Sequence, residues 1–330
     1  MFELNHSEEA EPLLDSLVNE AVRSLRKTLA DEGRESLAVL IDPALSNPVL
    51  PLIEKYDLPV TRLSLPYGDV DPHIQPYLVS IDNEPRHERF VNETVAIAVQ
   101  ESLAARDAWP AARSVSAWLM IDDAAMGVFS QRFRANAVIP VPGNASQRRL
   151  LRFWDPRVLP QLARIVGKDA WRHWLPVNAV WLSIDGWGQM SRNDFANPTT
   201  ESENHWQPDK QAWQALERIA DVNHSMVMSG TLHQTPDVRK FEHFDRLLLR
   251  ATQLGCTEAL DRVTYAVLID AMRLPLEQHP QIAVMLERTR REGVSFSDLL
   301  STLEPTDWER IRDDLMRTTD FKTSPFFAQE

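Results

Sequence analysis

Hydrophobic positions in the first part of the chain switch between helical spacing and a short continuous run. Residues 9–30 carry apolar side chains at every third or fourth position, which predicts an amphipathic helix that Gly33 ends. We expect this helix to pack on the first domain rather than to serve as a partner-binding arm. Residues 37–41 are all apolar, which favours a strand covered on both faces. Asp42 and Pro43 end this strand, and we interpret Asp42 as a turn-capping residue.

The same reasoning predicts alternating strands and helices as far as residue 184. Further strands are expected at residues 60–65, 77–81, 114–121, 147–154 and 177–184, and helices at residues 48–56, 88–106 and 124–135. The strand at residues 147–154 is expected to complete the sheet. This order predicts a compact lobe of mixed α/β structure, although it does not determine the order of strands.

Residues 150–154 alternate in a way that is typical of a strand. Leu151 and Phe153 are expected to face one side, with Arg152 and Trp154 on the other, because side chains along a strand alternate with period two. The stretch therefore predicts a strand that runs directly into a turn.

A helix signal follows at Asp155 and Pro156. A short carboxylate is a favoured N-cap, and proline fits the first helical position because the missing N–H needs no partner there. Apolar residues then continue at helical spacing to Val166. We expect Asp155 to be the N-cap and Arg157 to form an ion pair or lie at the surface.

The remainder of the chain predicts helices alone. Residues 186–208 are rich in Gly, Asn, Ser, Thr and Pro and are expected to form a linker or a long loop. Beyond them, helix caps recur without strand signals, and Ser295 with Asp298 and Thr306 with Glu309 have the spacing of a capping box. The predicted organisation is an N-terminal helix at 1–33, an α/β lobe at 34–185, this linker, and an all-α lobe at 209–330.

Tryptophans gather around the predicted linker. Seven of the ten lie in or beside it, at positions 154, 171, 174, 181, 187, 206 and 213. Tryptophan is enriched among the anchors of protein interfaces, but it also packs domains together, and the pattern fits both uses. We assign Trp187 and Trp206 as candidate partner-binding residues because they fall on the polar segment.

Composition narrows the class of protein. The 330 residues are 43% hydrophobic, no apolar run approaches the ~20 residues of a membrane span, and the start of the chain lacks an export signal. The single cysteine, Cys256, permits no internal disulfide and is interpreted as a small buried residue. A net charge of −13, with acids spread along the chain, makes nucleic acid an unsuitable partner. We expect a cytoplasmic protein without a membrane partner.

Sequence signatures of common catalytic sites are absent. The chain has no phosphate-binding glycine loop, no nucleophile elbow and no zinc-binding helix motif. His224, His233 and His243 are spaced too widely to predict a metal site, and Asp122 and Asp123 are better explained as helix caps. No metal and no cofactor are therefore expected.

Two stretches together resemble the type VI secretion effector chaperones, also called adaptors, of bacteria. The first comprises residues 37–45, and the second is the signature Arg-Phe-Trp-Asp-Pro-Arg at residues 152–157. The resemblance covers residues 34–185. It implies a structural or partner-binding role for Asp42, Pro43, Arg152, Phe153, Trp154, Asp155, Pro156 and Arg157.

This resemblance implies a non-enzymatic cytoplasmic chaperone. Its partners would be a toxic effector and the spike protein, the valine-glycine repeat protein, onto which the effector is loaded. The alternative is a cytoplasmic hydrolase or transferase with a site between the lobes. Such a site would use Asp42, Asp122 and one of the mid-chain histidines.

Overall fold

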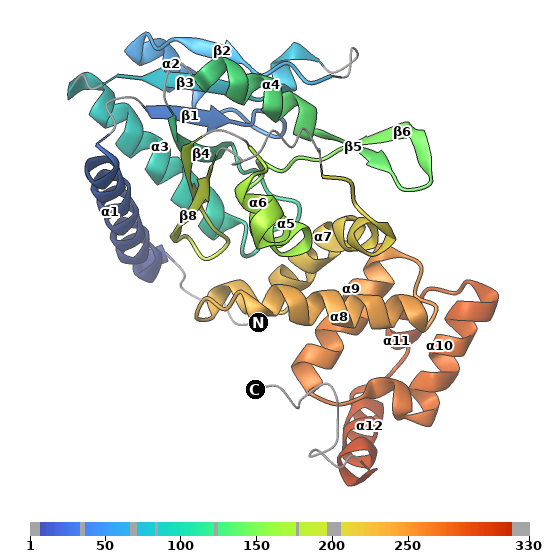
Figure 1. Cartoon of the computed structure of the whole chain (residues 1–330). Coiled ribbons are helices and arrows are strands. Elements are labelled where there is room, and N and C mark those ends of the chain that lie inside the picture. Colours follow the sequence, from blue (N-terminus) through green and yellow to red (C-terminus); the bar gives the residue numbers. More distant parts are fainter. Residues whose placement is uncertain are drawn as a thin grey trace. The chain divides into compact units, whose positions relative to one another are not determined.

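Two compact units make up the chain. The computed structural model describes residues 7–33, 37–66, 71–82, 85–121, 125–175, 178–196 and 206–318. The units are Met1–Leu216 and Glu217–Glu330. In the described residues all strands belong to the first unit, whereas the second is helical (Figure 1). The prediction of an α+β part followed by a helical part is confirmed.

The first unit is built on a six-stranded sheet. Its order is β2-β3-β1-β4-β7-β8, and all of its pairs are antiparallel. The strands are β1 (Leu37–Ile41), β2 (Val60–Arg62), β3 (Tyr77–Ile81), β4 (Val115–Ile121), β7 (Ala179–Ile184) and β8 (Met190–Phe195). The central strands β1 and β4 therefore come from segments far apart in the sequence.

Both faces of this sheet are covered, which explains the continuous apolar run of β1. Leu37, Val39 and Ile41 pack into one hydrophobic cluster, while Ala38 and Leu40 pack into a second cluster on the opposite face. All five side chains are buried. A strand that meets water on neither face has no reason to alternate polar with apolar residues.

Helices form a layer on each side of the sheet. The first cluster includes α1 (Ser7–Glu32), α2 (Leu50–Tyr56) and α3 (Pro85–Ala104), and the second includes α4 (Met126–Asn136), α5 (Leu159–Val166) and α6 (Lys168–Arg172). A short 3-10 helix, η1, spans Pro72–Ile74. Figure 1 shows α1 running beside α3. Because Ala21 and Leu25 of α1 are buried in the first cluster, this helix is part of the core.

A separate hairpin follows α4. Its strands are β5 (Val138–Val141) and β6 (Asn144–Leu150), which pair only with each other in the described residues. Figure 1 shows the hairpin extending away from the six-stranded sheet. The prediction that residues 147–154 complete the sheet is wrong, because β6 belongs to the hairpin and residues 151–158 form turns.

The predicted linker at residues 186–208 is partly a strand. Residues 190–195 form β8, which pairs with β7 along its whole length and provides one edge of the sheet. The sequence does not predict β8 because only Phe195 of this strand is fully buried, so its other positions can be polar. Residues 197–205 of the predicted linker lie outside the described residues.

The second unit consists of helices that follow one another closely. Helix α7 (Lys210–Met228) begins in the first unit and ends in the second, so the boundary falls later than the predicted residue 209. The other elements are η3 (Thr231–His233), α8 (Arg239–Gln253), α9 (Ala259–Met272), η4 (Leu276–Gln278), α10 (Pro280–Glu292), α11 (Phe296–Leu300) and α12 (Pro305–Thr318). Buried aromatic rings at Phe244, Tyr265 and Phe296 anchor its core.

Hydrogen bonds within this unit fix the ends of several helices. Ser295 caps α11 by accepting a hydrogen bond from the N–H of Asp298, as the capping-box spacing predicts. The same spacing at Thr306 is misleading, because α12 already begins at Pro305. Asp261 instead holds α9 against α11 by accepting hydrogen bonds from the Ser295 hydroxyl and the Ser297 N–H, each at 2.9 Å.

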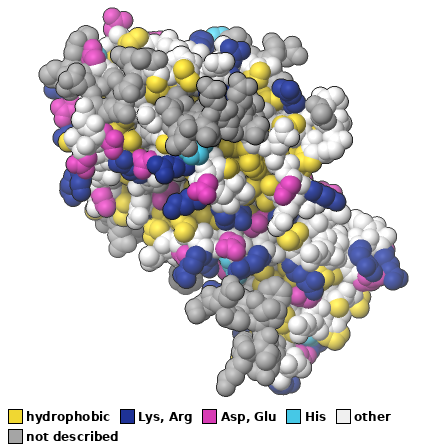
Figure 2. Space-filling view, viewed as in Figure 1, with side chains coloured by type: hydrophobic (Ala, Val, Ile, Leu, Met, Phe, Trp, Pro, Cys, Tyr) yellow, Lys and Arg dark blue, Asp and Glu magenta, His cyan; other side chains and the backbone are white. Residues whose placement is uncertain are grey.

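The surface carries charges of both signs. Figure 2 shows Lys and Arg side chains beside Asp and Glu side chains over much of the visible face. Many of them form exposed ion pairs, such as Arg288 with Glu292 one helical turn later. Such pairs contribute little to stability because water screens them. Among the described residues, no helix is both long enough and apolar enough to cross a lipid bilayer.

Candidate functional site

The signature stretch folds as consecutive turns rather than as a strand. The N–H of Phe153 donates to the carbonyl of Leu151 at 2.9 Å, and the N–H of Asp155 donates to that of Arg152 at 3.0 Å. This path sends Phe153 and Trp154 into the same core cluster. The prediction that they lie on opposite faces of a strand is therefore wrong. The sequence alternates because Arg152, which is partly exposed, lies between the buried residues Leu151 and Phe153.

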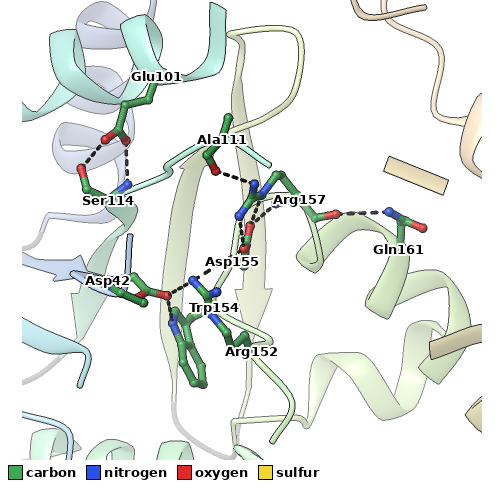
Figure 3. A network of polar contacts seen from close by, with 10 residues as sticks. Asp42, Glu101, Ala111, Ser114, Arg152, Trp154, Asp155, Arg157 and Gln161 are labelled. Carbon is green, nitrogen blue, oxygen red and sulfur yellow. Dashed lines mark hydrogen bonds and ion pairs between the residues drawn. The ribbon is translucent and has the colours of Figure 1, made fainter. Parts of the chain in front are cut away.

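Asp42 lies where the end of β1 meets this turn. Its N–H donates to the carbonyl of Ser114 at 2.8 Å, and its Oδ1 accepts the N–H of Ala44 at 3.1 Å, as expected for a turn-capping residue. Its Oδ2 accepts hydrogen bonds from Arg152 Nη2 at 2.7 Å and Trp154 Nε1 at 2.5 Å (Figure 3). The Asp42 side chain is only 2% exposed. Both carboxylate oxygens are thus occupied by donors from this chain.

Asp155 and Arg157 form a second buried pair within the same turn. Asp155 Oδ1 accepts the N–H and the Nε of Arg157 at 2.9 Å each, and Oδ2 accepts its Nη2 at 2.7 Å. Arg157 Nη1 also donates to the carbonyl of Ala111 at 2.6 Å. Burial alone would raise the pKa of Asp155, but the hydrogen bonds and charge of Arg157, together with Arg152, hold that pKa below its ordinary value.

Asp155 is not the N-cap of α5. That helix begins at Leu159 with Val158 as its N-cap, and its first turn contains Pro160 rather than the predicted Pro156. Asp155 instead caps the turn that precedes α5, because its carboxylate accepts a hydrogen bond from the backbone N–H of Arg157. The predicted ion pair of Arg157 is observed. Pro156, between the paired residues, is buried, as is Pro43 after Asp42.

Strand ends and the last turns of α3 add further charged groups to this region. The Arg113 side chain, just before β4, donates to the carbonyl of Ile184 at the end of β7. Arg113 is 4% exposed, and burial lowers its pKa to about 10. Glu101 accepts the N–H of Ser114 at 2.7 Å and its hydroxyl at 2.6 Å (Figure 3). Burial raises the pKa of Asp185, which follows β7.

These charged groups were missed by sequence reasoning. Arg113 and Glu101 stand in no motif, and their proximity depends on the sheet order that brings the ends of β4 and β7 together. One signal was present: Arg113 and Ser114 come immediately before a seven-residue strand that is buried throughout. A charged residue in that position must either reach water or find acceptors at the edge of the sheet.

Aromatic rings form the apolar side of the same site. Phe153 lies 4.9 Å from Phe133 and 5.5 Å from Trp154 between ring centroids, and it also contacts Trp174 and Trp181. These packed rings hold the signature turn against the sheet. In the signature turn, Phe153 and Trp154 thus lie in the hydrophobic core, whereas the charged side chains of Arg152 and Arg157 lie near the strand ends.

The two candidate partner-binding tryptophans both pack against other residues of the first unit. Trp187 is 4% exposed in the turn between β7 and β8, where its carbonyl accepts Arg106 Nη2 at 2.7 Å. Its N–H donates to Asp185 Oδ1 at 2.8 Å. Trp206 is partly buried and lies 5.6 Å from Trp174. The expectation that Trp187 offers an exposed face for a partner is wrong, because this side chain is buried in the turn between β7 and β8.

A metal site or the alternative catalytic site would use His, Cys, Asp or Glu side chains. Among the described residues, no three His, Cys, Asp or Glu side chains gather in a way that could hold a metal ion. Asp42, one member of the alternative catalytic set, has its carboxylate bound by Arg152 and Trp154, and Asp122 and Asp123 lie outside the described residues. Cys256 is buried, and burial raises its pKa to about 12.

Comparison of the chain with family models, with curated proteins and with solved structures finds no match.

Proposed function

We propose that this protein is a non-enzymatic cytoplasmic chaperone-adaptor that binds a type VI secretion effector and helps to load it onto the spike protein. One observation supports the proposal most directly. The two sequence stretches that resemble the chaperone family are far apart in the chain, yet they meet through the hydrogen bonds from Arg152 and Trp154 to Asp42. A signature whose separate parts meet in one buried cluster is expected to define a domain.

The chemistry of the cluster suits a scaffold. Asp42 and Asp155 each accept charge-assisted hydrogen bonds from arginine, and both side chains are nearly inaccessible to water. An acid or base in catalysis must exchange protons with a substrate, and these carboxylates would first have to lose their partners. Their arrangement instead holds the loops that surround the strand ends in fixed positions, which is what a binding surface requires.

A loading factor must also release its cargo. Reversible binding is expected to use an interface of about 1,600 Å² with a few dominant residues, rather than the large apolar surface of a permanent complex. The structure of the first unit provides a rigid base for such a surface because both faces of its sheet are covered by helices.

The test is to identify the bound partners and then to measure whether secretion of the bound effector depends on this protein. The tagged full-length chain is purified from its native cells during active secretion, and the bound proteins are identified by mass spectrometry. We expect one effector and the spike protein. Deletion of the gene should then remove that effector from the secreted fraction, and expression of the intact chain should restore it.

Other effectors provide the control in the same strain, because a specific adaptor leaves their secretion unchanged. A deletion strain that secretes every effector at the normal level would refute the proposal. Loss of all effectors together would point instead to a structural component of the secretion apparatus.

A further inference from the structure

Basic residues outnumber acidic residues in one segment of the first unit. Residues 125–175 contain nine Lys or Arg residues and only two Asp or Glu residues, although the whole chain carries a net charge of −13. The acidic residues are therefore spread along the rest of the chain, whereas this segment is basic. This segment forms α4, the hairpin, the signature turn, α5 and α6, which lie on one side of the sheet.

Several of these cations have no acidic partner. In the described part of the chain the side chains of six of them form no ion pair or hydrogen bond: Arg132, Arg134, Arg148, Arg149, Lys168 and Arg172. By contrast, Arg152 and Arg157 of the same segment are bound to Asp42 and Asp155. Unpaired cations on an otherwise acidic protein attract acidic partners.

The hairpin offers this partner a free strand edge. The N–H of Leu151 donates to the carbonyl of Ala137 at 2.8 Å. In an antiparallel pair, hydrogen-bonded and non-hydrogen-bonded positions alternate, so Ile139 and Arg149 form the next hydrogen-bonded pair. Arg148 is opposite Pro140 at a non-hydrogen-bonded position, and its N–H and carbonyl point away from β5.

The two outer edges of the hairpin are not equivalent. Pro140 occupies an outward position of β5 and has no N–H, so it obstructs pairing on that side. On β6, the outward positions are Arg148 and Leu150, which both carry an N–H and a carbonyl. No strand pairs with this side of β6 in the described residues, and every β6 side chain that can be described is exposed.

We propose that the outer edge of β6 binds an extended acidic segment of the effector as an added antiparallel or parallel strand. The identification of the partner as an effector rests on the proposed function, whereas the chemistry of the edge does not. Arg148 and Arg149 point to opposite faces of the hairpin because they are adjacent in a strand. An added strand with acidic residues on both faces would therefore meet an arginine on each.

Other occupants fit this edge less well. A second copy of β6 would place arginines beside arginines, and like charges on neighbouring strands repel. Nucleic acid could use the cations, but its phosphates offer only acceptors and leave the outward carbonyls of Arg148 and Leu150 without donors. A peptide backbone supplies donors and acceptors in alternation, as the edge requires.

Photochemical crosslinking in the native cell tests the contact. The crosslinking residue p-benzoylphenylalanine replaces Gln147 on β6 of the full-length chain, or Arg23 on α1 as a control site on the other helical layer. Both positions are exposed. We expect crosslinking from position 147 alone, to a protein segment of net negative charge. No crosslink, a crosslink to nucleic acid or a crosslink to a second copy would each overturn the proposal.

A synthetic peptide of the crosslinked segment then tests how it binds. Arg148→Glu with Arg149→Glu should weaken binding at least about tenfold, because two attractions become repulsions. Arg23→Glu with Arg89→Glu makes the same change of charge at exposed residues of α1 and α3 and should leave binding unchanged. A peptide that is N-methylated at alternate residues loses the N–H groups of one edge and should bind β6 in only one of its two methylation registers.

Equal binding by both N-methylated peptides would exclude strand addition. The identity of the crosslinked protein separates this inference from the proposed function. If the segment is acidic and binds as a strand but its protein is not secreted, the docking edge stands and the effector-loading function fails. If the effector is captured but the arginine substitutions leave its affinity unchanged, the function stands and the docking edge fails.

Discussion

Arg152 donates a hydrogen bond to Asp42 at 2.7 Å across a separation of 110 residues in the chain. The Asp42 side chain is almost fully buried, while the Arg152 side chain is 33% exposed. The pair therefore joins the end of a central strand to a turn whose aromatic side chains lie in the core. Its main role in the folded protein is to fix the position of that turn.

Replacing Asp42 should be costly. Asp42→Ala removes the acceptor shared by Arg152 and Trp154, and we expect the free energy of unfolding to fall by about 3 kcal/mol. Urea denaturation at neutral pH measures this change. Asp71→Ala is the control, because the exposed Asp71 caps a single N–H, that of His73, and should cost about 0.5 kcal/mol. Equal costs for the two variants would contradict a structural role for the Asp42 contacts.

Arg157→Lys should destabilise the protein by about 2 kcal/mol although it keeps the charge. Lysine cannot reproduce the two-pronged contact with Asp155 or the additional bond to Ala111. The chain contains a matched control, since Asp237 and Arg239 have the same spacing and the same contacts. The Arg239 side chain is 79% exposed, so Arg239→Lys should change stability by less than about 0.5 kcal/mol in the same urea experiment.

The depressed pKa of Asp155 predicts the direction of a pH effect. A carboxyl whose folded pKa lies below its ordinary value of 3.8 stabilises the folded state above that value. This contribution is lost as the pH falls through the lower folded pKa. The difference in unfolding free energy between the natural protein and Asp155→Asn should therefore be fully present above about pH 5 and shrink as the pH falls below the ordinary value of 3.8. A difference that grows on acidification would mean that burial, rather than Arg157, controls the pKa.

Trp187 and Trp206 should differ in their effect on stability. Trp187→Ala empties a buried site and is expected to cost about 3 kcal/mol, seen as a large fall in melting temperature. Trp206→Ala removes a partly buried ring and should cost less, about 1 kcal/mol. Melting curves of the two variants check this order. If Trp187→Ala leaves the melting temperature unchanged, the turn between β7 and β8 does not hold this side chain in the core.

Gly255 in the second unit is expected to tolerate no side chain. It has a φ of +104°, and a Cβ there would lie 2.6 Å from Cβ of Arg290 on α10. Gly230 also has a positive φ, of +67°, but a Cβ there would meet nothing within 4 Å. Both alanine variants should lose about 1 kcal/mol from the backbone, and Gly255→Ala should lose more because of the overlap. Comparing their free energies of unfolding from urea denaturation gives the added cost of the overlap together with the larger φ at Gly255.

The elements themselves were readable from the sequence because their signals are local. The apolar run of β1, the spacing within α1 and the cap at Ser295 each depend on neighbours within a few residues. These signals gave the class of both parts of the chain. They also placed Asp42 and the signature residues in one domain, but only through their resemblance to a family.

What the sequence could not provide was the outcome of contacts between distant segments. The residues around Phe153 and Trp154 alternate as in a strand, yet both side chains are buried because they pack against the ring of Phe133. Strand β8 was hidden because an edge strand with one exposed face can be polar. The proximity of Arg113 to Ile184 follows from strand order, which no local pattern encodes.

That strand order also constrains how the protein is made. Strand β4 pairs with β1 on one side and β7 on the other, so the middle of the sheet is complete only when residue 184 has left the ribosome. Until then the apolar edge of β4 lacks its second neighbour, and contacts of such long range slow folding. A protein of this architecture would expose an open strand edge during its synthesis, and that edge would have to be protected from pairing with other chains.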